Sequence, residues 1–548
     1  MPTVKPAVCL VLHAHMPYVL KHGHWPHGEV WLMEAAVGVY LPLIGMLQRL
    51  SRRKVSASFS LGLTPILLLQ LADKGFQARL LRYIDERLER AAKDHIDSDI
   101  CETSKYWFKH YQTLKQLYSQ IKYNIPQAFA KAQNRGQIEI LSGPATHPYA
   151  ALLTSDRTLE HQIRVGRQIS KRILGKCSSG IWLPECSHRP QIVRRDPISG
   201  GQERLRYGVD RILERCGVSH FFVESDLFDA ARSEGVVKHG VFHKTSWDAV
   251  SEYQEFMWRS VLEPHRVNTM GKHSRIVALA RHPEACAQVW SADGGYPGDS
   301  AYLEFHKRKD TQGHRYWRVT DRGIGLGGKK LYHPASAGLT ARAHAVDYLQ
   351  KIESWLSAHP FGRPATLTLC FDAELFGHWW FEGPQFLEHL LHLLGQHPHI
   401  DATTADRRIR ETDVDKVVWL GEGSWGAEGD HRVWWNDQST WMWQCIHRAE
   451  HRFHQLSDAL QAARKPTQKA IRLHKHLSWA FLLLQSSDWI FVITTKGAVD
   501  YGYQRFCEQL SRFDALAEAV EFALKRKRIS AVTELKVKEA ILMQPNDG

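Results

Sequence analysis

The stretch TLTLCFDAE, residues 366–374, is a largely apolar run that ends in two carboxylates, Asp372 and Glu374. A run of this kind is typical of a parallel strand that is buried on both faces. Six further runs have the same character, at 7–12, 55–61, 138–141, 180–183, 220–223 and 275–280. Longer segments with helical spacing separate them. This alternation of strands and helices predicts an α/β fold with a parallel sheet.

Polar groups follow the ends of these runs. The segments that follow are HAH after the first run, SGPATH after the third, PE after the fourth, ESD after the fifth, RHPEA after the sixth and DAE after the seventh. In a parallel barrel the carboxyl ends of all strands meet at one rim, where active sites are built. We therefore predict a (β/α)7 barrel, with a doubly wound open sheet as the alternative.

The barrel is expected to occupy residues 1–411, with two insertions. Residues 75–135 are highly charged, with apolar residues at helical spacing, which predicts a helical insertion. Residues 186–218 are rich in Gly, Pro and Arg, which is typical of a loop. The strand pattern stops after about residue 410, so residues 412–548 are expected to form an all-helical C-terminal domain that completes the cleft.

Cysteine usage and hydropathy predict a soluble, cytoplasmic protein. The nine cysteines are an odd number without a CxxC pair, which suits a reducing compartment. The N-terminus lacks a signal-peptide cleavage pattern. The apolar stretch at 477–495 is broken by Ser486, Ser487 and Asp488, so it is a poor membrane span and a good core helix.

The net charge of +13 could suggest an anionic partner. However, the 58 acidic residues are spread among the basic ones, and no nucleic-acid-binding motif accompanies the charge. We expect no nucleic-acid partner. The 19 tryptophans point instead to carbohydrate, because flat aromatic rings stack well on sugars.

Three histidines belong to the same predicted rim. His13 and His15 are two positions apart on a strand, so their side chains share one face, and His147 follows the third run. A metal site, hydrogen bonding to sugar hydroxyls and a structural role are all compatible with this pattern.

Glu185 and Asp372 are the candidate catalytic pair. Each follows a buried strand, and tryptophans flank both. An ordinary loop glutamate and a helix-capping aspartate are the plain alternatives. Two carboxylates at about 5 to 5.5 Å would support a retaining glycosidic reaction, in which one is the nucleophile and the other the acid/base.

Five segments together resemble glycoside hydrolase family 57, and within it most closely the 1,4-α-glucan branching enzymes. They are HAHMPYV (13–19), GQIEILSGPATH (136–147), GIWLPECSHRP (180–190), CFDAELFGHWWFEGP (370–384), and the C-terminal WMWQCIHRAE with LLLQSSDWIF. GEVWLMEAAVGVYLPLI, QVWSADGGYPGDSAYLEFH, GEGSWGAEGDHRVWWND and QSSDW support the branching subgroup. The resemblance spans nearly the whole chain. It implies a (β/α)7 barrel with a helical C-terminal domain.

The same resemblance implies the roles of the site residues. Glu185 becomes the nucleophile and Asp372 the acid/base, with no cofactor and no metal. The implied substrate-binding residues are His13, His15, Trp31, His147, Arg281, Trp290, Gly298, Trp425, Trp434 and Asp488. The implied partner is an α-glucan such as amylose or a glycogen-like polymer, whose α-1,4-linked chains would be transferred to a 6-hydroxyl to form α-1,6 branches.

Other functions remain open from the sequence. In branching enzymes a mobile loop favours transfer over hydrolysis; the corresponding stretch here, about 234–274, departs from the usual pattern, and Tyr253 is its candidate aromatic residue. A 4-α-glucanotransferase or an α-amylase of the same fold is one alternative. A metal-dependent, deacetylase-like barrel that uses His13, His15 and an acid is another, and a non-enzymatic glucan-binding protein is the third.

Overall fold

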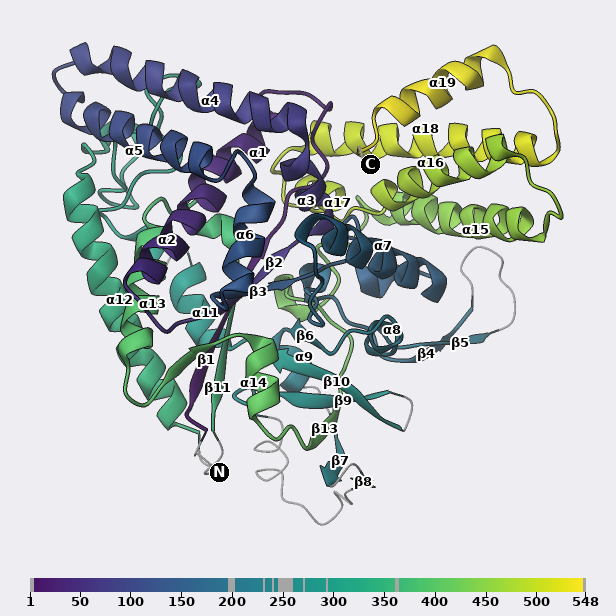
Figure 1. Ribbon diagram of the computed structural model, residues 1–548, viewed down its shortest axis with the longest axis horizontal. Coiled ribbons are helices and arrows are strands. Elements are labelled where there is room, and N and C mark those ends of the chain that lie inside the picture. Colours follow the sequence, from purple (N-terminus) through teal and green to yellow (C-terminus); the bar gives the residue numbers. More distant parts are fainter. Residues whose placement is uncertain are drawn as a thin grey trace.

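The computed structural model describes residues 4–195, 203–229, 232–238, 241–244, 260–269, 272–291, 294–359 and 364–545. Its central barrel lies in the middle of the molecule (Figure 1). Seven parallel strand segments form this barrel. Six of the segments are β1 (Ala7–Ala14), β2 (Phe59–Leu63), β3 (Ile138–Leu141), β6 (His220–Val223), β10 (Lys272–Ala280) and β11 (Thr366–Asp372). Residues 180–181 are the seventh, because they bridge Ser142 and His220 in parallel.

The strands follow the order β11, β1, β2, β3, residues 180–181, β6 and β10. A backbone hydrogen bond of 3.0 Å from His282 to Thr368 joins the chain after β10 to β11. All eight residues of β1 are buried, as expected of a strand covered on both faces. The predicted (β/α)7 barrel is confirmed.

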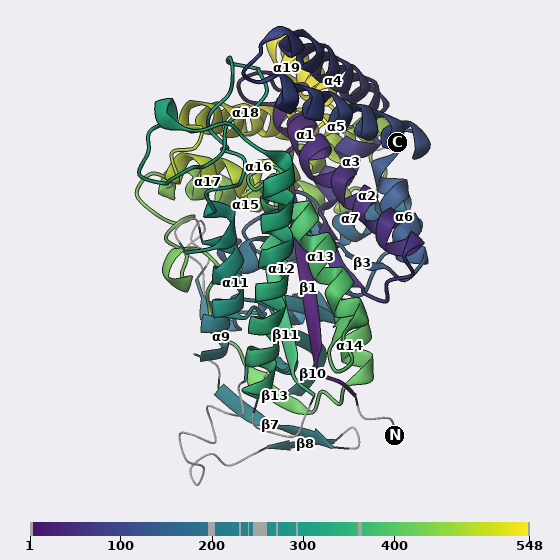
Figure 2. The same cartoon turned by 90° about the vertical axis from the view of Figure 1, so that its left-hand side faces the viewer.

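Helices cover the outside of the barrel (Figure 2). They include α3 (Pro65–Ala72), α7 (Asp156–Leu174), α8 (Val209–Arg215), α9 (Ser225–Asp229), α11 (Pro283–Trp290), α12 (Pro334–Ser357), α13 (Gly383–Gln396) and α14 (Ala405–Glu411). Two more, α1 (Glu29–Ala35) and α2 (Leu41–Arg52), are joined by a π-helical turn. The joined segment Glu29–Arg52 is long and apolar enough to cross a membrane, but 78% of its most apolar window is buried inside the protein, as in a core helix.

The two predicted insertions differ in content. The first contains α4 (Lys74–Lys93), α5 (Cys101–Gln120) and α6 (Ile125–Asn134), in agreement with a helical insertion. The second contains a hairpin of β4 (Ile192–Arg194) and β5 (Arg204–Arg206), followed by α8. It is therefore not purely loop.

A second, mixed sheet extends from β6 and β10. It adds β9 (His265–Thr269), β13 (Lys416–Trp419), β7 (Arg232–Lys238) and β8 (Val241–Lys244), while the short strand β12 (Asp401–Thr403) pairs with β1. The expectation that strands stop near residue 410 is wrong, because β13 pairs with β9 and β7. The domain limits at 411 and 412 stay predictions. Tyr253 lies outside the described residues.

The C-terminal region is a helical bundle. Its helices are α15 (Thr440–Ala462), α16 (Gln468–Leu484), α17 (Asp488–Thr494), α18 (Val499–Leu524) and α19 (Ala531–Leu542). Phe453 and Phe481 stack in its core with ring centroids 4.2 Å apart. The turn before α17 docks on the barrel rim, where the Ser487 amide donates a hydrogen bond of 3.0 Å to the His147 carbonyl. The bundle thereby places the start of α17 at the strand ends.

Candidate active site

A cleft of about 350 Å³ opens at the carboxyl ends of the barrel strands. The barrel and the segments around it contribute His13, His15, Met16, Pro17, Trp31, Ala35, His147, Glu185, Trp290, Asp372, Glu374, His378, Trp379 and Trp425. The α17 region contributes Asp488, Trp489, Phe491 and Val492. Both candidate catalytic carboxylates therefore face one cavity, although they are far apart in the sequence.

Glu185 sits on a strained turn after the fourth strand segment. Glu185 and Cys186 have φ values of 58° and 51°, in the left-handed region that residues with a side chain rarely adopt. Trp425 holds the turn by donating its backbone N–H to the Glu185 carbonyl at 3.0 Å. Its indole Nε1–H donates to Oε2 at 2.8 Å, and the Ser487 hydroxyl donates to Oε1 at 3.2 Å. The carboxylate is fixed on both oxygens.

The electrostatics of Glu185 favour its neutral form. Burial raises its pKa to about 8, the Trp425 hydrogen bond opposes this rise, and the negative charges of Asp372 and Asp488 add to it. Because Asp372 perturbs Glu185 electrostatically, the two carboxyl groups interact across the cleft. A pair of acids that resist simultaneous ionisation suits one ionised and one protonated partner.

Asp372 is the last residue of β11. The strand register places it beside His13 of β1. Burial raises the pKa of Asp372 well above its usual range, the Glu374 carboxylate raises it further, and Arg281 opposes this. This rise favours the protonated form of Asp372, which a general acid requires.

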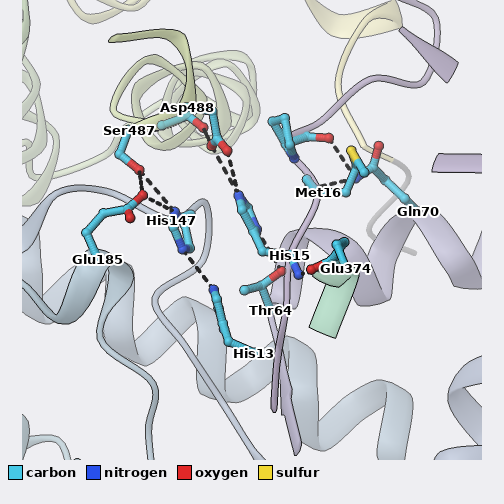
Figure 3. Close-up of polar contacts among 12 residues, drawn as sticks. His13, His15, Met16, Thr64, Gln70, His147, Glu185, Glu374, Ser487 and Asp488 are labelled. Carbon is cyan, nitrogen blue, oxygen red and sulfur yellow. Dashed lines mark hydrogen bonds and ion pairs between the residues drawn. The ribbon is translucent and has the colours of Figure 1, made fainter. Parts of the chain in front are cut away.

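A chain of hydrogen bonds connects three predicted residues (Figure 3). His13 Nε2 lies 3.1 Å from His147 Nε2, and His147 Nδ1 lies 3.0 Å from Ser487 Oγ. When Glu185 is ionised it can only accept, so Ser487 donates to it and His147 Nδ1 must donate to Ser487. His147 Nε2 then accepts from His13. Burial lowers the pKa of both His13 and His147 well below the usual range, so both rings are neutral, as this chain requires.

His15 forms a second polar cluster with Asp488. Its Nε2 lies 2.9 Å from Asp488 Oδ1, and its Nδ1 lies 3.0 Å from Thr64 Oγ1. Burial alone would raise the pKa of Asp488, but His15 holds it at about 2. Asp488 therefore provides a permanent negative charge at the cleft, with the His15 ring fixed against it.

Among the described residues, His15, His147 and Asp488 could offer ligand atoms to a metal ion, since these atoms lie within 4.8 Å of one another. However, each of the three side chains already makes hydrogen bonds inside the protein. The donor set is also compatible with the hydrogen-bonded cluster just described. The three side chains thus have hydrogen-bond partners without a metal ion.

Three of the four predicted tryptophans line the cleft: Trp31, Trp290 and Trp425. Trp434 does not, since only 1% of it is exposed, and Tyr149 at 4.6 Å and Phe491 at 6.2 Å between ring centroids cover it. Phe491 lines the cleft in its place. Trp434 thus supports the wall from behind rather than offering a face to a sugar.

Arg281 and Gly298 also lie away from the residues that line the cleft. Arg281 forms an ion pair of 2.8 Å with Glu224 and acts on the site through its charge near Asp372. Gly298 ends a short 3-10 turn, and its carbonyl accepts a hydrogen bond of 3.4 Å from Arg322. Neither position touches the cavity, so neither is placed to bind a sugar in it.

The structure adds residues that were not among the predicted site residues, including Glu374, Trp379 and Phe491 in the cleft and Ser487 beside Glu185. Glu374 accepts a hydrogen bond of 2.6 Å from the Tyr40 hydroxyl, and burial raises its pKa to about 7. Glu374 could have been found from the sequence, because it is a second carboxylate two positions after Asp372 at the end of the same strand. No local pattern marks Ser487, because its role depends on the docking of α17.

Comparisons with known proteins identify the family of this chain. The Glycosyl hydrolase family 57 profile matches residues 9–418, and the profile of the 1,4-alpha-glucan branching enzyme C-terminal region matches residues 445–545. A 1,4-alpha-glucan branching enzyme of Thermococcus kodakarensis is 34% identical, over 94% of this chain and 74% of its own length.

Solved structures give the same picture. A GH57-type branching enzyme from Pyrococcus horikoshii has a TM-score of 0.86 at 33% identity, covering 98% of this chain and 95% of that one. The α-amylase AmyC of Thermotoga maritima has a TM-score of 0.81 at 26% identity, covering 99% and 98%. With the sequence profile, the curated relative and the fold in agreement, this chain belongs to glycosyl hydrolase family 57.

Proposed function

We propose that this protein is a 1,4-α-glucan branching enzyme that works by retaining double displacement. The observation that supports this most is the pair of perturbed carboxyl groups, Glu185 and Asp372, in one tryptophan-lined cleft of a family 57 barrel. The match of residues 445–545 to the branching-enzyme C-terminal profile directs the choice among the activities of the family. The substrate is an α-glucan such as amylose or a glycogen-like polymer.

In the first step, ionised Glu185 attacks the anomeric carbon of an α-1,4-linked glucosyl unit. The bond from that carbon to the glycosidic oxygen breaks, and the proton of Asp372 passes to that oxygen, which leaves as a 4-hydroxyl. Trp425 and Ser487 orient the Glu185 oxygens by hydrogen bonds. The product is a covalent glycosyl-enzyme ester on Glu185.

In the second step, Asp372, now ionised, takes the proton from the 6-hydroxyl of an acceptor glucose. The acceptor oxygen attacks the anomeric carbon, Glu185 leaves as a carboxylate, and an α-1,6 branch forms. Water can compete for the intermediate, so transfer needs acceptor contacts and a shielded cleft. Trp290 and Trp425, with ring centroids 6.4 Å apart, form one shielding wall.

Linkage analysis of amylose after incubation tests this proposal. Wild type should form new α-1,6 linkages and lower the iodine absorbance with little new reducing sugar. Glu185→Gln and Asp372→Asn should each lose at least about 10³-fold in rate. A matched control is Trp441→Ala, since Trp441 lies on α15 and does not line the cleft. Absence of α-1,6 product from wild type would reject branching.

Hydrolysis is the second candidate function, because the α-amylase AmyC shares the fold over nearly the full length of both chains. A hydrolase would release reducing ends in proportion to bonds cleaved, without α-1,6 product. For the location we propose the cytoplasm, which the nine free cysteines support. Oxidation of the purified protein to a disulfide-linked form with higher activity would contradict that location.

A further inference from the structure

A second cavity, of about 180 Å³, shares Trp31 with the catalytic cleft. Its walls are formed by α1, by α4 of the helical insertion and by the loop around Gln312. The lining residues include Trp25, Trp31, Tyr83, Glu86, Arg87 and Arg308. We call this cavity the Trp25 groove. The steps proposed above make no use of it or of α4.

Three aromatic side chains, Trp25, Trp31 and Tyr83, line the Trp25 groove. Trp25 is 48% exposed, which is unusual for so large an apolar side chain. Tyr83 is held by the Arg87 guanidinium, which lies 6.0 Å from its ring centroid. Trp31 packs edge-on against Tyr501, with ring centroids 5.5 Å apart. Because neighbours hold Tyr83 and Trp31, these two rings can contact a sugar ring at a low ordering cost, and the exposed Trp25 offers a third ring.

The polar groups of the groove suit an uncharged, hydroxyl-rich ligand. Arg308 is neutralised by an ion pair of 3.0 Å with Glu34. Arg87 donates to the carbonyls of Gln312 and Gly313, which fixes the groove floor. The exposed Glu86 carboxylate lies beside these donors. With acids and guanidinium groups interleaved, the groove offers both acceptors and donors and no concentrated positive charge for a phosphate.

We propose that the Trp25 groove binds distal glucosyl units of a long α-glucan chain whose reacting unit lies at Glu185. This inference rests on the proposed function. Trp31 borders both cavities, so the groove lies next to the catalytic cleft, within reach of a glucan chain that extends beyond it. The groove adds affinity for long chains and none for oligosaccharides that end within the cleft. The helical insertion thereby becomes part of the substrate path.

Kinetics with Trp25→Ala test the inference, since this side chain is exposed and its removal should not impair folding. For Trp25→Ala we expect the KM for amylose to rise about threefold to tenfold, the loss of one sugar-stacking ring. The kcat/KM for maltopentaose should stay within about twofold of wild type. Trp441→Ala, which removes a Trp that is 37% exposed and lies outside both cavities, is the control and should change neither value.

Binding measured without turnover separates this inference from the proposed function. Glu185→Gln and the double variant Glu185→Gln/Trp25→Ala are compared by affinity electrophoresis in gels that contain glycogen. We expect the double variant to be retarded less, by about the same factor as the KM change. Equal retardation of the two, together with an amylose KM equal to that of Trp441→Ala, would overturn the inference. If wild type instead forms no α-1,6 linkages, branching fails while the binding comparison still decides the groove.

Discussion

Trp425 binds Glu185 twice, through its backbone N–H to the Glu185 carbonyl at 3.0 Å and through its indole N–H to Oε2 at 2.8 Å. One residue thus holds both the left-handed backbone of Glu185, the proposed nucleophile, and the orientation of its carboxylate. The indole bond also favours the charged form, which burial disfavours. The sequence suggested only a sugar-facing ring at Trp425, so the hydrogen bond gives this residue a second task.

Trp425→Phe removes the indole donor and keeps the backbone bond. Because the donor lowers the pKa of Glu185, we expect the acid limb of the kcat/KM profile to move to higher pH. We also expect kcat/KM at pH 7 to fall about tenfold to hundredfold, the loss of a hydrogen bond to a charged group. Trp290→Phe, which lines the same cleft, should leave the acid limb in place. An unmoved limb in Trp425→Phe would contradict the argument.

Glu374→Gln should move the alkaline limb of the kcat/KM profile. The Glu374 carboxylate raises the pKa of Asp372, so its removal lowers that pKa and Asp372 loses its proton at a lower pH. The general acid then fails earlier as the pH rises, and the alkaline limb of kcat/KM moves to lower pH. A profile measured from pH 5 to 10 checks this. An alkaline limb that stays in place, or moves upward, would show that Glu374 does not act on Asp372.

Asp488→Asn removes a negative charge that raises the pKa of Glu185. We expect the acid limb to move to lower pH, opposite to Trp425→Phe. The variant should still lose about tenfold or more in kcat/KM, because His15 loses the charge-assisted bond that orients it. Thr64→Ala, which removes the other partner of His15 and no charge, should lower kcat/KM without moving the limb. If the acid limb moves in the same direction in Asp488→Asn and Trp425→Phe, the Asp488 charge does not raise the pKa of Glu185.

Glu185→Gln should stabilise the fold, with a gain that depends on pH. The pKa of Glu185 is about 8 in the folded protein, against roughly 4.3 in the unfolded chain. Between these values the unfolded chain has released a proton that the folded protein retains, so wild-type stability falls as pH rises. The gain in free energy of unfolding should be near zero at pH 4 and roughly 4 kcal/mol at pH 8, because each pH unit between the two pKa values adds about 1.4 kcal/mol.

Urea unfolding at both pH values measures this gain. Glu89 is exposed, so its carboxylate is solvated in both the folded and the unfolded state. The control Glu89→Gln should therefore show no gain in free energy of unfolding that increases with pH. A constant difference between wild type and Glu185→Gln across pH would place the pKa of Glu185 near its ordinary value.

Chelation separates the glycosidic chemistry from the metal-dependent alternative. His15 Nε2 and Asp488 Oδ1 are 2.9 Å apart and bonded to each other, so we expect the protein to work without a metal at this cluster. Dialysis against EDTA should leave the rate of amylose conversion unchanged, with less than one equivalent of metal by elemental analysis. Loss of activity that added Zn²⁺ restores would instead support a metal site at His15, His147 and Asp488.

The sequence by itself determined the barrel and its catalytic rim. Burial on both faces makes each parallel strand a short apolar run, and the chain must turn polar where the strand leaves the core. Local pattern therefore located β1, β3, β6 and β11, and it placed Glu185 and Asp372 at strand ends. The family resemblance supplied the roles of these two carboxylates.

Only the tertiary structure decided which residues surround Glu185 and Asp372. The strand β13 is only four residues long and depends on pairing with β9, about 150 positions earlier in the chain, so local pattern did not reveal that strands continue past residue 410. The covering of Trp434 and the approach of Ser487 to Glu185 depend on how the helical bundle docks on the rim. A hydrophobic pattern records how far each residue is buried, whereas contacts between distant segments are set by packing in three dimensions.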